Sequence, residues 1–494
     1  MLLFVFVVVR NAWVSDDAYI TFRMVDNWVS GYGLRWNVAE RVCASTHPLW
    51  MLLHAPLFAI GVRPFAATLA LSVVASVATV WVFVAYVART TPAALAGVTV
   101  LVFSKAFVDY STSGLENPLT HLLAALFFAA FFAEPRARAK ALVLWLSTCL
   151  GLAMTNRMDT VVLFVPAMVQ AMVTSRVPGR FRLVALGLAP FVLWEAFSVV
   201  YYGFPLPNPA YAKVLETGIS RWDLAHQGLL YLRHAAVTDP VTVIALAGGV
   251  LAAVVTRDLR RACAAAGICL YVVYVVLVGG DFMSGRFLSA PLLLGVMILG
   301  TCELAATARR AAISVGSTVV VALVAGDPPV ATSSDGGSSA RPAVDDGITD
   351  ERAAYFATAG LINAWRFDEM PAHPSAERGR RARATFRDGE TITARSVGYF
   401  GYYAGPRLYI IDLYGLGDPL LARLPAAQAS GGWRIGHFLR TVPEGYARSV
   451  VLERDVIEDD AVRRYYDLLR LVTRGPLLGA DRWRAIWKLN TGGA

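Results

Sequence analysis

The chain has 494 residues, of which 56% are hydrophobic and only 16% are charged, and its mean hydropathy is +0.52. This composition excludes an ordinary soluble globular protein and indicates a chain that folds in a membrane. The net charge of +9 is gathered in short loops rather than spread over one basic face, which argues against a nucleic-acid partner.

Long apolar segments recur from the N-terminus to about residue 325 and then stop, and most are long enough to cross a bilayer. In chain order they are 1–14, 66–88, 92–108, 118–133, 141–155, 160–174, 183–202, 240–256, 262–279, 287–306 and 311–325. The sequence therefore predicts about eleven transmembrane helices. The first segment is short, so we expect either a span whose beginning is missing or an uncleaved signal anchor.

Basic loops between these segments predict the orientation of the chain. Lys and Arg cluster in four of them, at 134–140, 175–182, 257–261 and 309–310. By the positive-inside rule these loops are cytoplasmic, in a plasma membrane that the chain crosses many times. Alternation then assigns a second set of segments to the extracytoplasmic side: 15–64, 104–117, 156–159, 203–239, 280–286 and everything after 326.

The first external loop, 15–64, is predicted to contain two helices. An amphipathic helix runs from about Ala18 to Ser30, is stopped by Gly31, and is expected to lie flat on the outer leaflet. The loops alternate correctly between the two sides of the membrane only if the segment 48–62 does not cross it. Its short length agrees with a re-entrant or interfacial helix.

Three parts follow along the chain: a transmembrane catalytic domain at 1–325, a Gly/Ser/Asp-rich linker at 326–340, and an extracytoplasmic α/β domain at 341–494. Within the last part the sequence predicts a helix near 350–366 and strands at 391–397 and 408–411. The basic segment 378–387 is expected to be a solvated loop.

Polar residues gather at the predicted external ends of the spans. Charged side chains at such depth are costly unless they pair, line a wet cavity or bind a ligand, so their concentration on one side predicts a functional site. The candidates in this set are Asp16, Asp17, Glu116, Asn117, Arg157, Asp159, Lys213, Asp281 and Arg286.

Asp16 and Asp17 are adjacent carboxylates directly before a predicted helix. Two like charges in a partly desolvated site raise one pKa, which suits a base that takes a proton from a sugar hydroxyl. The alternative is structural, because Asp17 or Ser15 could cap the helix that begins at Ala18.

Arg157, Lys213 and Arg286 are the cations that we expect to bind an anionic leaving group. Arg matches phosphate in a bidentate manner, and Lys supplies a movable point charge. The alternative for the two arginines is an internal ion pair, between Arg157 and Asp159 and between Arg286 and Asp281.

Several motifs, in the same order along most of the chain, resemble those of GT-C polyprenyl-phosphate-sugar glycosyltransferases, and among them the mycobacterial arabinofuranosyltransferases. The motifs are Asp16–Arg23, Gly31–Asn37, Glu40–Val42, Thr112–Asn117, Ala212–Lys213, Gly279–Met283 with Gly285–Arg286, Ile411–Asp412, Gly415–Leu416, Pro419–Leu420 and Arg434–His437. Two departures are that Asp159 stands where Glu is expected and that the tail is abbreviated.

The resemblance implies a polytopic α-helical membrane protein of the GT-C type with a C-terminal soluble α/β domain. It also implies a decaprenyl-phosphoryl-arabinose donor held in membrane lipid, and an acceptor at the arabinan ends of arabinogalactan or lipoarabinomannan in cell-wall synthesis. An aspartate of the first external loop would be the base, with Asp16 favoured and Asp17 second. Glu116, Asn117, Asp159, Asp281 and His437 would be supporting or acceptor-binding residues.

Two other functions are weighed against this one. The nearer alternative is a GT-C transferase that uses another polyprenyl-phosphate sugar, such as mannose. The more distant one is a lipid or sugar transporter, which would place ionisable residues near the membrane midplane and often show paired repeats. The sequence indicates no particular cofactor, and a divalent cation stays open. The His residues and the five Cys residues show no metal-ligand spacing, so a divalent cation has no recognisable site.

Overall fold

The computed structural model describes residues 1–133, 139–302, 307–326, 328–331, 346–427, 432–452 and 454–492. Most of the predicted linker 326–340 and most of the basic loop 134–140 lie outside these residues. The described chain is largely helical and folds as two compact units, each made of three separate stretches. We call them the bundle unit (Met1–Ser15, Phe65–Phe191 and Arg221–Pro371) and the loop–tail unit (Asp16–Pro64, Val192–Ser220 and Ala372–Ala494).

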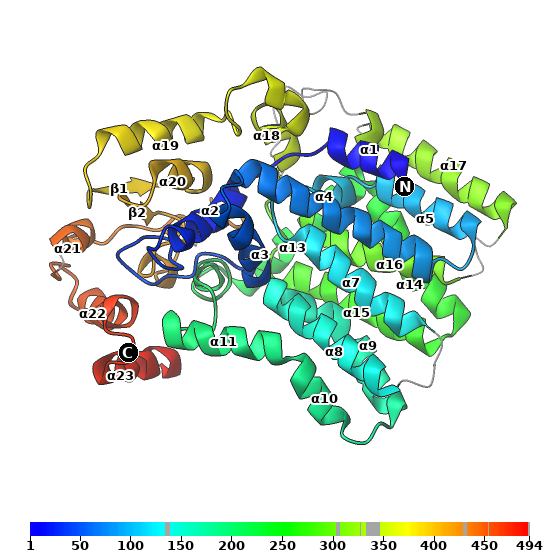
Figure 1. Ribbon diagram of the computed structural model, residues 1–494, viewed down its shortest axis with the longest axis horizontal. Coiled ribbons are helices and arrows are strands. Elements are labelled where there is room, and N and C mark those ends of the chain that lie inside the picture. The colour runs from blue at the N-terminus through cyan, green and yellow to red at the C-terminus, as the bar shows by residue number, and fades with distance from the viewer. Residues whose placement is uncertain are drawn as a thin grey trace. The chain divides into compact units, whose positions relative to one another are not determined.

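The bundle unit contains long apolar helices that lie side by side, together with several shorter or more polar helices (Figure 1). They are α1 (Leu2–Arg10), α4 (Pro64–Val82), α5 (Thr91–Phe103), α6 (Lys105–Asp109), α7 (Asn117–Phe132), α8 (Ala139–Asn156), α9 (Val161–Ser175), α10 (Arg180–Gly187), α13 (Arg221–Thr238), α14 (Pro240–Thr256), α15 (Leu259–Leu277), α16 (Ser289–Gly300), α17 (Ala308–Ala325) and α18 (Glu351–Ala359).

Small residues let the bundle helices approach one another closely. A Cβ on Gly249 of α14 would lie 2.6 Å from the Cα of Gly295 of α16, and one on Gly267 of α15 would lie 2.2 Å from the Leu163 carbonyl oxygen of α9. Close backbone contact of this kind is how helices associate in lipid, where apolar burial supplies little driving force.

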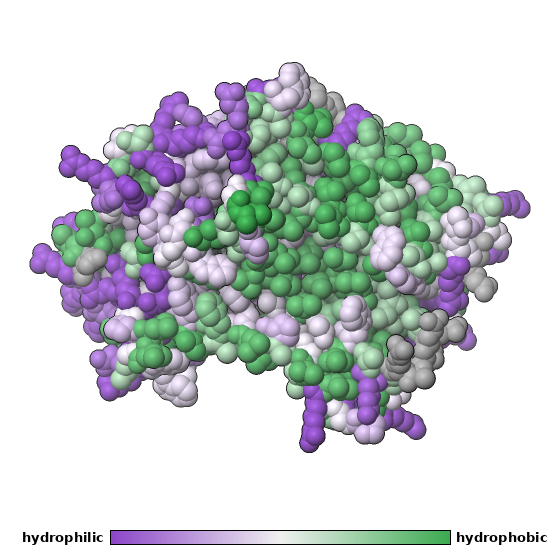
Figure 2. All heavy atoms as spheres, viewed as in Figure 1, coloured by the Kyte–Doolittle hydropathy of each residue, from purple (hydrophilic) through white to green (hydrophobic). Residues whose placement is uncertain are grey.

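Apolar side chains also cover the outside of the bundle helices, as the face in Figure 2 shows. Leu251 and Val254 of α14 and Val324 of α17 are among the exposed ones. An apolar exterior is stable only in lipid, so this unit is a multi-pass membrane domain. Among the described residues, five helices are long and apolar enough to cross a membrane, or seven if two bent pairs each count as one span. The count of about eleven stays a prediction.

Two segments of the bundle unit differ from the sequence expectations. The predicted span 92–108 is broken at Ser104, whose side chain accepts a hydrogen bond from the Phe107 amide and caps α6. The predicted external loop 203–239 contains the 18-residue helix α13. Its polar composition gives no membrane-span signal, and for this reason the hydropathy pattern does not reveal it.

The loop–tail unit joins the first predicted external loop to the C-terminal part of the chain. Its helices are α2 (Asp16–Val29), α3 (Pro48–Ala59), α11 (Ala189–Tyr201, mostly in this unit), α12 (Asn208–Ala210), α19 (Pro374–Thr385), α20 (Gly398–Ala404), α21 (Tyr446–Leu452), α22 (Asp460–Arg474) and α23 (Ala480–Thr491). Two short strands, β1 (Thr391–Ala394) and β2 (Tyr409–Asp412), pair in parallel on either side of α20 in the sequence.

Both strands and α3 form where the sequence predicts them, whereas the solvated loop predicted at 378–387 is wrong. Residues up to Thr385 belong to α19. Its small residues Ala376 and Ala382 are buried, and Glu377 pairs with Arg381 at 3.0 Å along the exposed side. The arginines therefore mark the outer face of an amphipathic helix, which the charge run conceals.

Helix α2 is fixed to the tail by a buried arginine and an aromatic cluster. The Arg23 guanidinium donates to the carbonyl oxygens of Trp36, Gly401 and Leu408. One turn earlier, the Tyr19 ring contacts those of Tyr399, Tyr402 and Tyr403, with centroids 4.8–6.0 Å apart. The first loop and the tail consequently share one hydrophobic core.

Candidate active site

Five charged side chains of the bundle unit form one network, which we call the arginine cluster: Glu116, Arg157, Asp159, Asp281 and Arg286. Glu116 precedes α7 and is almost fully buried, with 1% of its surface exposed. Its Oε1 lies 2.9 Å from an Arg157 terminal nitrogen and 3.0 Å from an Arg286 terminal nitrogen. One carboxylate therefore holds both arginines, which come from different parts of the chain.

Each arginine also binds an aspartate of its own segment. Arg157 makes a bidentate pair with Asp159, at 2.8 and 3.0 Å, and Arg286 contacts Asp281 at a longer 3.4 Å. The internal ion pairs considered from the sequence are thus present. The Arg157 guanidinium also lies over the Phe287 ring, 4.4 Å from its centroid, which fixes the plane of the guanidinium.

Asn117 supports the arginine cluster from the first turn of α7. Its amide nitrogen donates to the Ser289 hydroxyl at 3.2 Å and, more weakly, to the Arg286 carbonyl oxygen at 3.4 Å. These bonds tie α7 to the segment that carries Arg286. Six predicted site residues, Asn117 included, are therefore brought together in this unit.

Asp16 occupies an unexpected position in the loop–tail unit. Its two carboxylate oxygens accept hydrogen bonds from the Tyr399 amide at 2.8 Å and the Gly398 amide at 3.2 Å. Asp16 thus caps α20, a helix nearly 400 residues away in sequence, rather than α2. The pKa of Asp16 is raised to about 7, chiefly by burial and also by the Asp17 charge, while the two amide hydrogen bonds act against this shift.

Asp17, Lys213 and His437 lie close enough in the same unit to interact electrostatically. Asp17 is partly exposed, unlike the buried Asp16. The pKa of His437 is lowered to about 4, chiefly by burial and also by the charges of Arg434 and Lys213. His437 is therefore neutral near pH 7, with its ring 5.1 Å from that of Tyr414.

Asp412, at the end of β2, is a buried acid that the sequence pattern marks only as part of a motif. Its carboxylate accepts hydrogen bonds from the Tyr414 and Gly417 amides. Burial raises its pKa to about 6, and the Lys213 charge opposes this effect. A single Asp directly after an apolar strand is the only sequence signal of this role.

Gly398 is a second residue that sequence reasoning misses. A Cβ at this position would lie 1.9 Å from the Asp16 backbone carbonyl oxygen. Only glycine allows the start of α20 to approach Asp16 closely enough for the two amide hydrogen bonds.

Within the described residues, no three His, Cys, Asp or Glu side chains are placed to hold a metal ion together. The predicted site residues instead fall into two sets: the arginine cluster with Asn117 in the bundle unit, and Asp16, Asp17, Lys213 and His437 in the loop–tail unit.

The fold is similar to that of solved structures of ArnT from Cupriavidus metallidurans. The structure bound to undecaprenyl phosphate matches with a TM-score of 0.52 over 86% of this chain and 87% of that one, at 14% sequence identity, and the apo structure matches with a TM-score of 0.51. ArnT is a GT-C glycosyltransferase, so this chain has the GT-C fold.

Two relatives of named activity are similar to this chain in sequence. A terminal β-(1→2)-arabinofuranosyltransferase of Mycobacterium tuberculosis is 24% identical over 88% of this chain and 82% of its own length. The protein of the same name from Corynebacterium glutamicum is 29% identical over 57% of this chain and 46% of its own length. A family model for a domain of unknown function (DUF8728) matches residues 364–489. The chain is a membrane glycosyltransferase that resembles the terminal arabinofuranosyltransferases.

Replacing Gly398 by alanine is expected to displace Asp16 and to lower glycosyl transfer at least tenfold, because the new Cβ cannot fit against the Asp16 backbone. The matched control is Gly401→Ala in the same helix, where the nearest atom to a new Cβ is a Trp36 ring carbon at 3.3 Å. The two purified variants are compared in a transfer assay. Equal activities would show that the Gly398–Asp16 contact is not needed.

Proposed function

We propose that this chain transfers arabinofuranose from decaprenyl-phosphoryl-arabinose to terminal residues of an arabinan on the extracytoplasmic side of the plasma membrane. The observation that carries the proposal is the similarity to a terminal arabinofuranosyltransferase along 88% of the chain. The arginine cluster and the first-loop carboxylates supply the two kinds of chemistry that such a transfer requires.

The arginine cluster binds the phosphate of the donor in this proposal. Its three carboxylates outnumber its two guanidiniums, so a phosphate adds to a cluster that is already negative and must replace one of the acids. Asp281 has the longest ion pair, at 3.4 Å to Arg286, and is the partner that a phosphate would displace. Arg157 and Arg286 then stabilise the leaving phosphate.

Asp16 takes the proton. As a bond forms between the acceptor hydroxyl oxygen and the anomeric carbon of arabinose, the bond from that carbon to the phosphate oxygen breaks. The hydroxyl proton passes to Asp16, and decaprenyl phosphate leaves. Because polyprenyl phosphate is already a good leaving group, positioning and one proton transfer are the main tasks of the protein. Asp17 is the second candidate for the base.

The activity is tested with radiolabelled polyprenyl-phosphate sugars and an arabinan oligosaccharide. Decaprenyl-phosphoryl-arabinose is expected to be used in preference to the mannose donor. Asp16→Asn is expected to lower kcat by about 10²–10⁴-fold, as for loss of a general base. Asp460→Asn, at an exposed position in α22, is the control. Full activity in both Asp16→Asn and Asp17→Asn would rule out either residue as the base. Preference for the mannose donor would replace arabinose by mannose as the proposed sugar.

The pH dependence follows from the raised pKa of Asp16. A base must be ionised to accept a proton, so kcat/KM is expected to fall about tenfold per pH unit below a pKa of about 7. The Asp17 charge helps to raise that pKa. Asp17→Asn should therefore move the acidic limb of the profile to lower pH, provided that Asp16 is the base. A limb that stays in place in Asp17→Asn would contradict this reading.

A further inference from the structure

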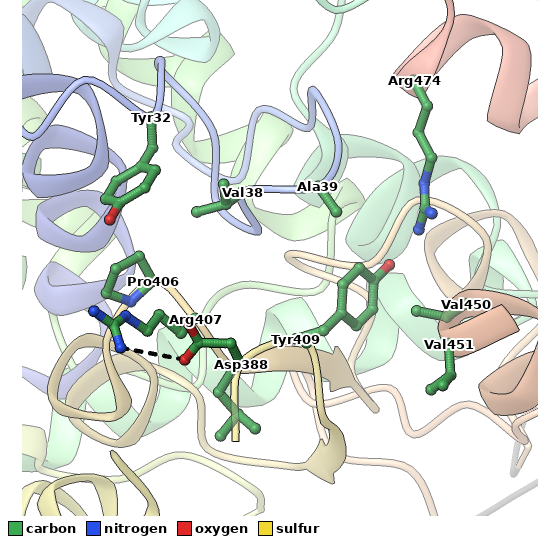
Figure 3. Close-up of a pocket in the computed structure, with 12 residues that line it drawn as sticks. Tyr32, Val38, Ala39, Asp388, Pro406, Arg407, Tyr409, Val450, Val451 and Arg474 are labelled. Atoms are coloured by element: carbon green, nitrogen blue, oxygen red, sulfur yellow. Dashed lines mark hydrogen bonds and ion pairs between the residues drawn. The ribbon is translucent and has the colours of Figure 1, made fainter. Parts of the chain in front are cut away.

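A cavity of about 530 Å³ opens in the loop–tail unit, apart from every residue assigned to the transfer itself. Figure 3 shows its walls: Tyr32 and Val38 from the first loop, Arg407 and Tyr409 at the start of β2, and Arg474 at the end of α22. The volume lies within the range of small-ligand sites, about 300–1,000 Å³. Helix α2 spans 14 residues, or about 21 Å, between Asp16 and the loop that carries Tyr32.

The charges in the cavity wall are paired. Arg407 contacts Asp388 at 3.3 Å, an ion pair that Figure 3 marks. Arg474 lies 3.6 Å from the buried carboxylate of Glu40, which also accepts a hydrogen bond from the Tyr409 hydroxyl at 2.6 Å. A wall with balanced charge does not favour a phosphate or a nucleotide. The large number of polar groups in the same wall does not favour a lipid chain.

Two polar groups of the wall lack a hydrogen-bond partner. The Nε and one terminal nitrogen of Arg474 are buried and have no hydrogen bond within the part of the chain that the structure describes. A buried donor without an acceptor is costly. Because these nitrogens are closed off from the cavity, a small shift of the Arg474 side chain would bring them to a ligand oxygen.

We propose that this cavity binds neutral sugar units of the acceptor glycan, remote from the unit that reacts. Sugar hydroxyls both donate and accept, which matches the Asp388 carboxylate and the two guanidiniums. The C–H faces of a sugar ring pack on apolar walls such as Val451 and on the exposed Tyr32 ring. Binding energy from remote sugars would select long acceptors over short ones. This inference rests on the proposed glycan acceptor.

The test compares two tryptophan variants of neighbouring residues with similar exposure. Val451 lines the cavity and Leu452 does not, while both are about half exposed. Val451→Trp is expected to raise the KM for a long arabinan oligosaccharide about tenfold, leaving kcat and the KM for a disaccharide unchanged. Leu452→Trp should behave like the wild type.

Equilibrium binding of the long oligosaccharide to the full chain without donor separates this proposal from the proposed function. Binding that is lost in Val451→Trp supports the cavity whether or not transfer is observed. Transfer without any length preference, together with undiminished binding in Val451→Trp, overturns the cavity proposal and leaves the transferase intact.

A second surface of the loop–tail unit lies on the C-terminal helix α23. Trp487 is 72% exposed and Trp483, one turn earlier, is 36% exposed, while Leu478 just before the helix is 81% exposed. The basic side chains of Arg484 and Lys488 are exposed on the same helix. Tryptophan beside basic residues is the composition of helices that lie in the membrane interface.

Hydrogen bonds to the end of α11 hold α23 in place. The buried Arg482 donates to the carbonyl oxygens of Val200 and Tyr201, both at 2.9 Å, and Asn490 donates to that of Gly203 at 2.9 Å. These carbonyls lie at the end of α11, which with α10 forms a bent candidate span. Leu193 of α11 is strongly exposed, as expected for a lipid-facing residue. Helix α23 is thus held where a lipid-facing helix ends.

We infer that α23 lies on the lipid surface with Leu478, Trp483 and Trp487 inserted among the headgroups. The full chain, with its native cysteines replaced, is labelled with an environment-sensitive fluorophore at Trp487→Cys or at Asp481→Cys, a position on the other side of the same helix. In nanodiscs that contain spin-labelled lipid, the probe at 487 is expected to be quenched at least twofold more than the probe at 481. Equal quenching at the two positions would overturn the inference.

Discussion

The contact between α2 and α20 is the constraint on which the loop–tail unit depends. Asp16 accepts two amide hydrogen bonds at the start of α20, and Arg23, two turns later in α2, donates to the carbonyl oxygens of Gly401 and Leu408 in the tail. A carboxylate is stabilised at the N-terminus of a helix, and a buried guanidinium is stabilised when several carbonyls accept from it. The first residue and the middle of α2 are consequently held by polar bonds as well as by packing.

The same contact has two opposing effects on the ionisation of Asp16. Its amide hydrogen bonds favour the ionised carboxylate, while its burial favours the protonated one and prevails. The pKa of Asp16 consequently lies near neutral pH, at about 7. In the arginine cluster the largely buried groups are cations, and carboxylates hold them in place. Glu116 pairs with both arginines and so sets the spacing between them.

How much of this structure the sequence predicts depends on the range of the interactions involved. Apolar runs and Pro or Gly breaks are local, and the bundle helices, β1 and β2 follow from them. Helix α13 is polar, and α19 hides its small buried face under a run of arginines, so neither has a clear local signal. The pairing of Arg157 with Asp159 is predictable because the two residues are neighbours, whereas the link from both arginines to Glu116 is not. Gly398 acts through Asp16, which is far away in the chain, and no single-sequence pattern identifies such a partner.

The loop–tail unit is made of three stretches, the first ending at Pro64 and the last starting at Ala372. During synthesis, at roughly 5–20 residues per second, the first stretch therefore exists for tens of seconds before its packing partner leaves the ribosome. Throughout that time the ring of Tyr19 and the guanidinium of Arg23 have no tail to contact. Biogenesis must shelter this early segment, in a chaperone or against the lipid headgroups, and a nascent chain that stops short of α20 leaves it permanently unfinished.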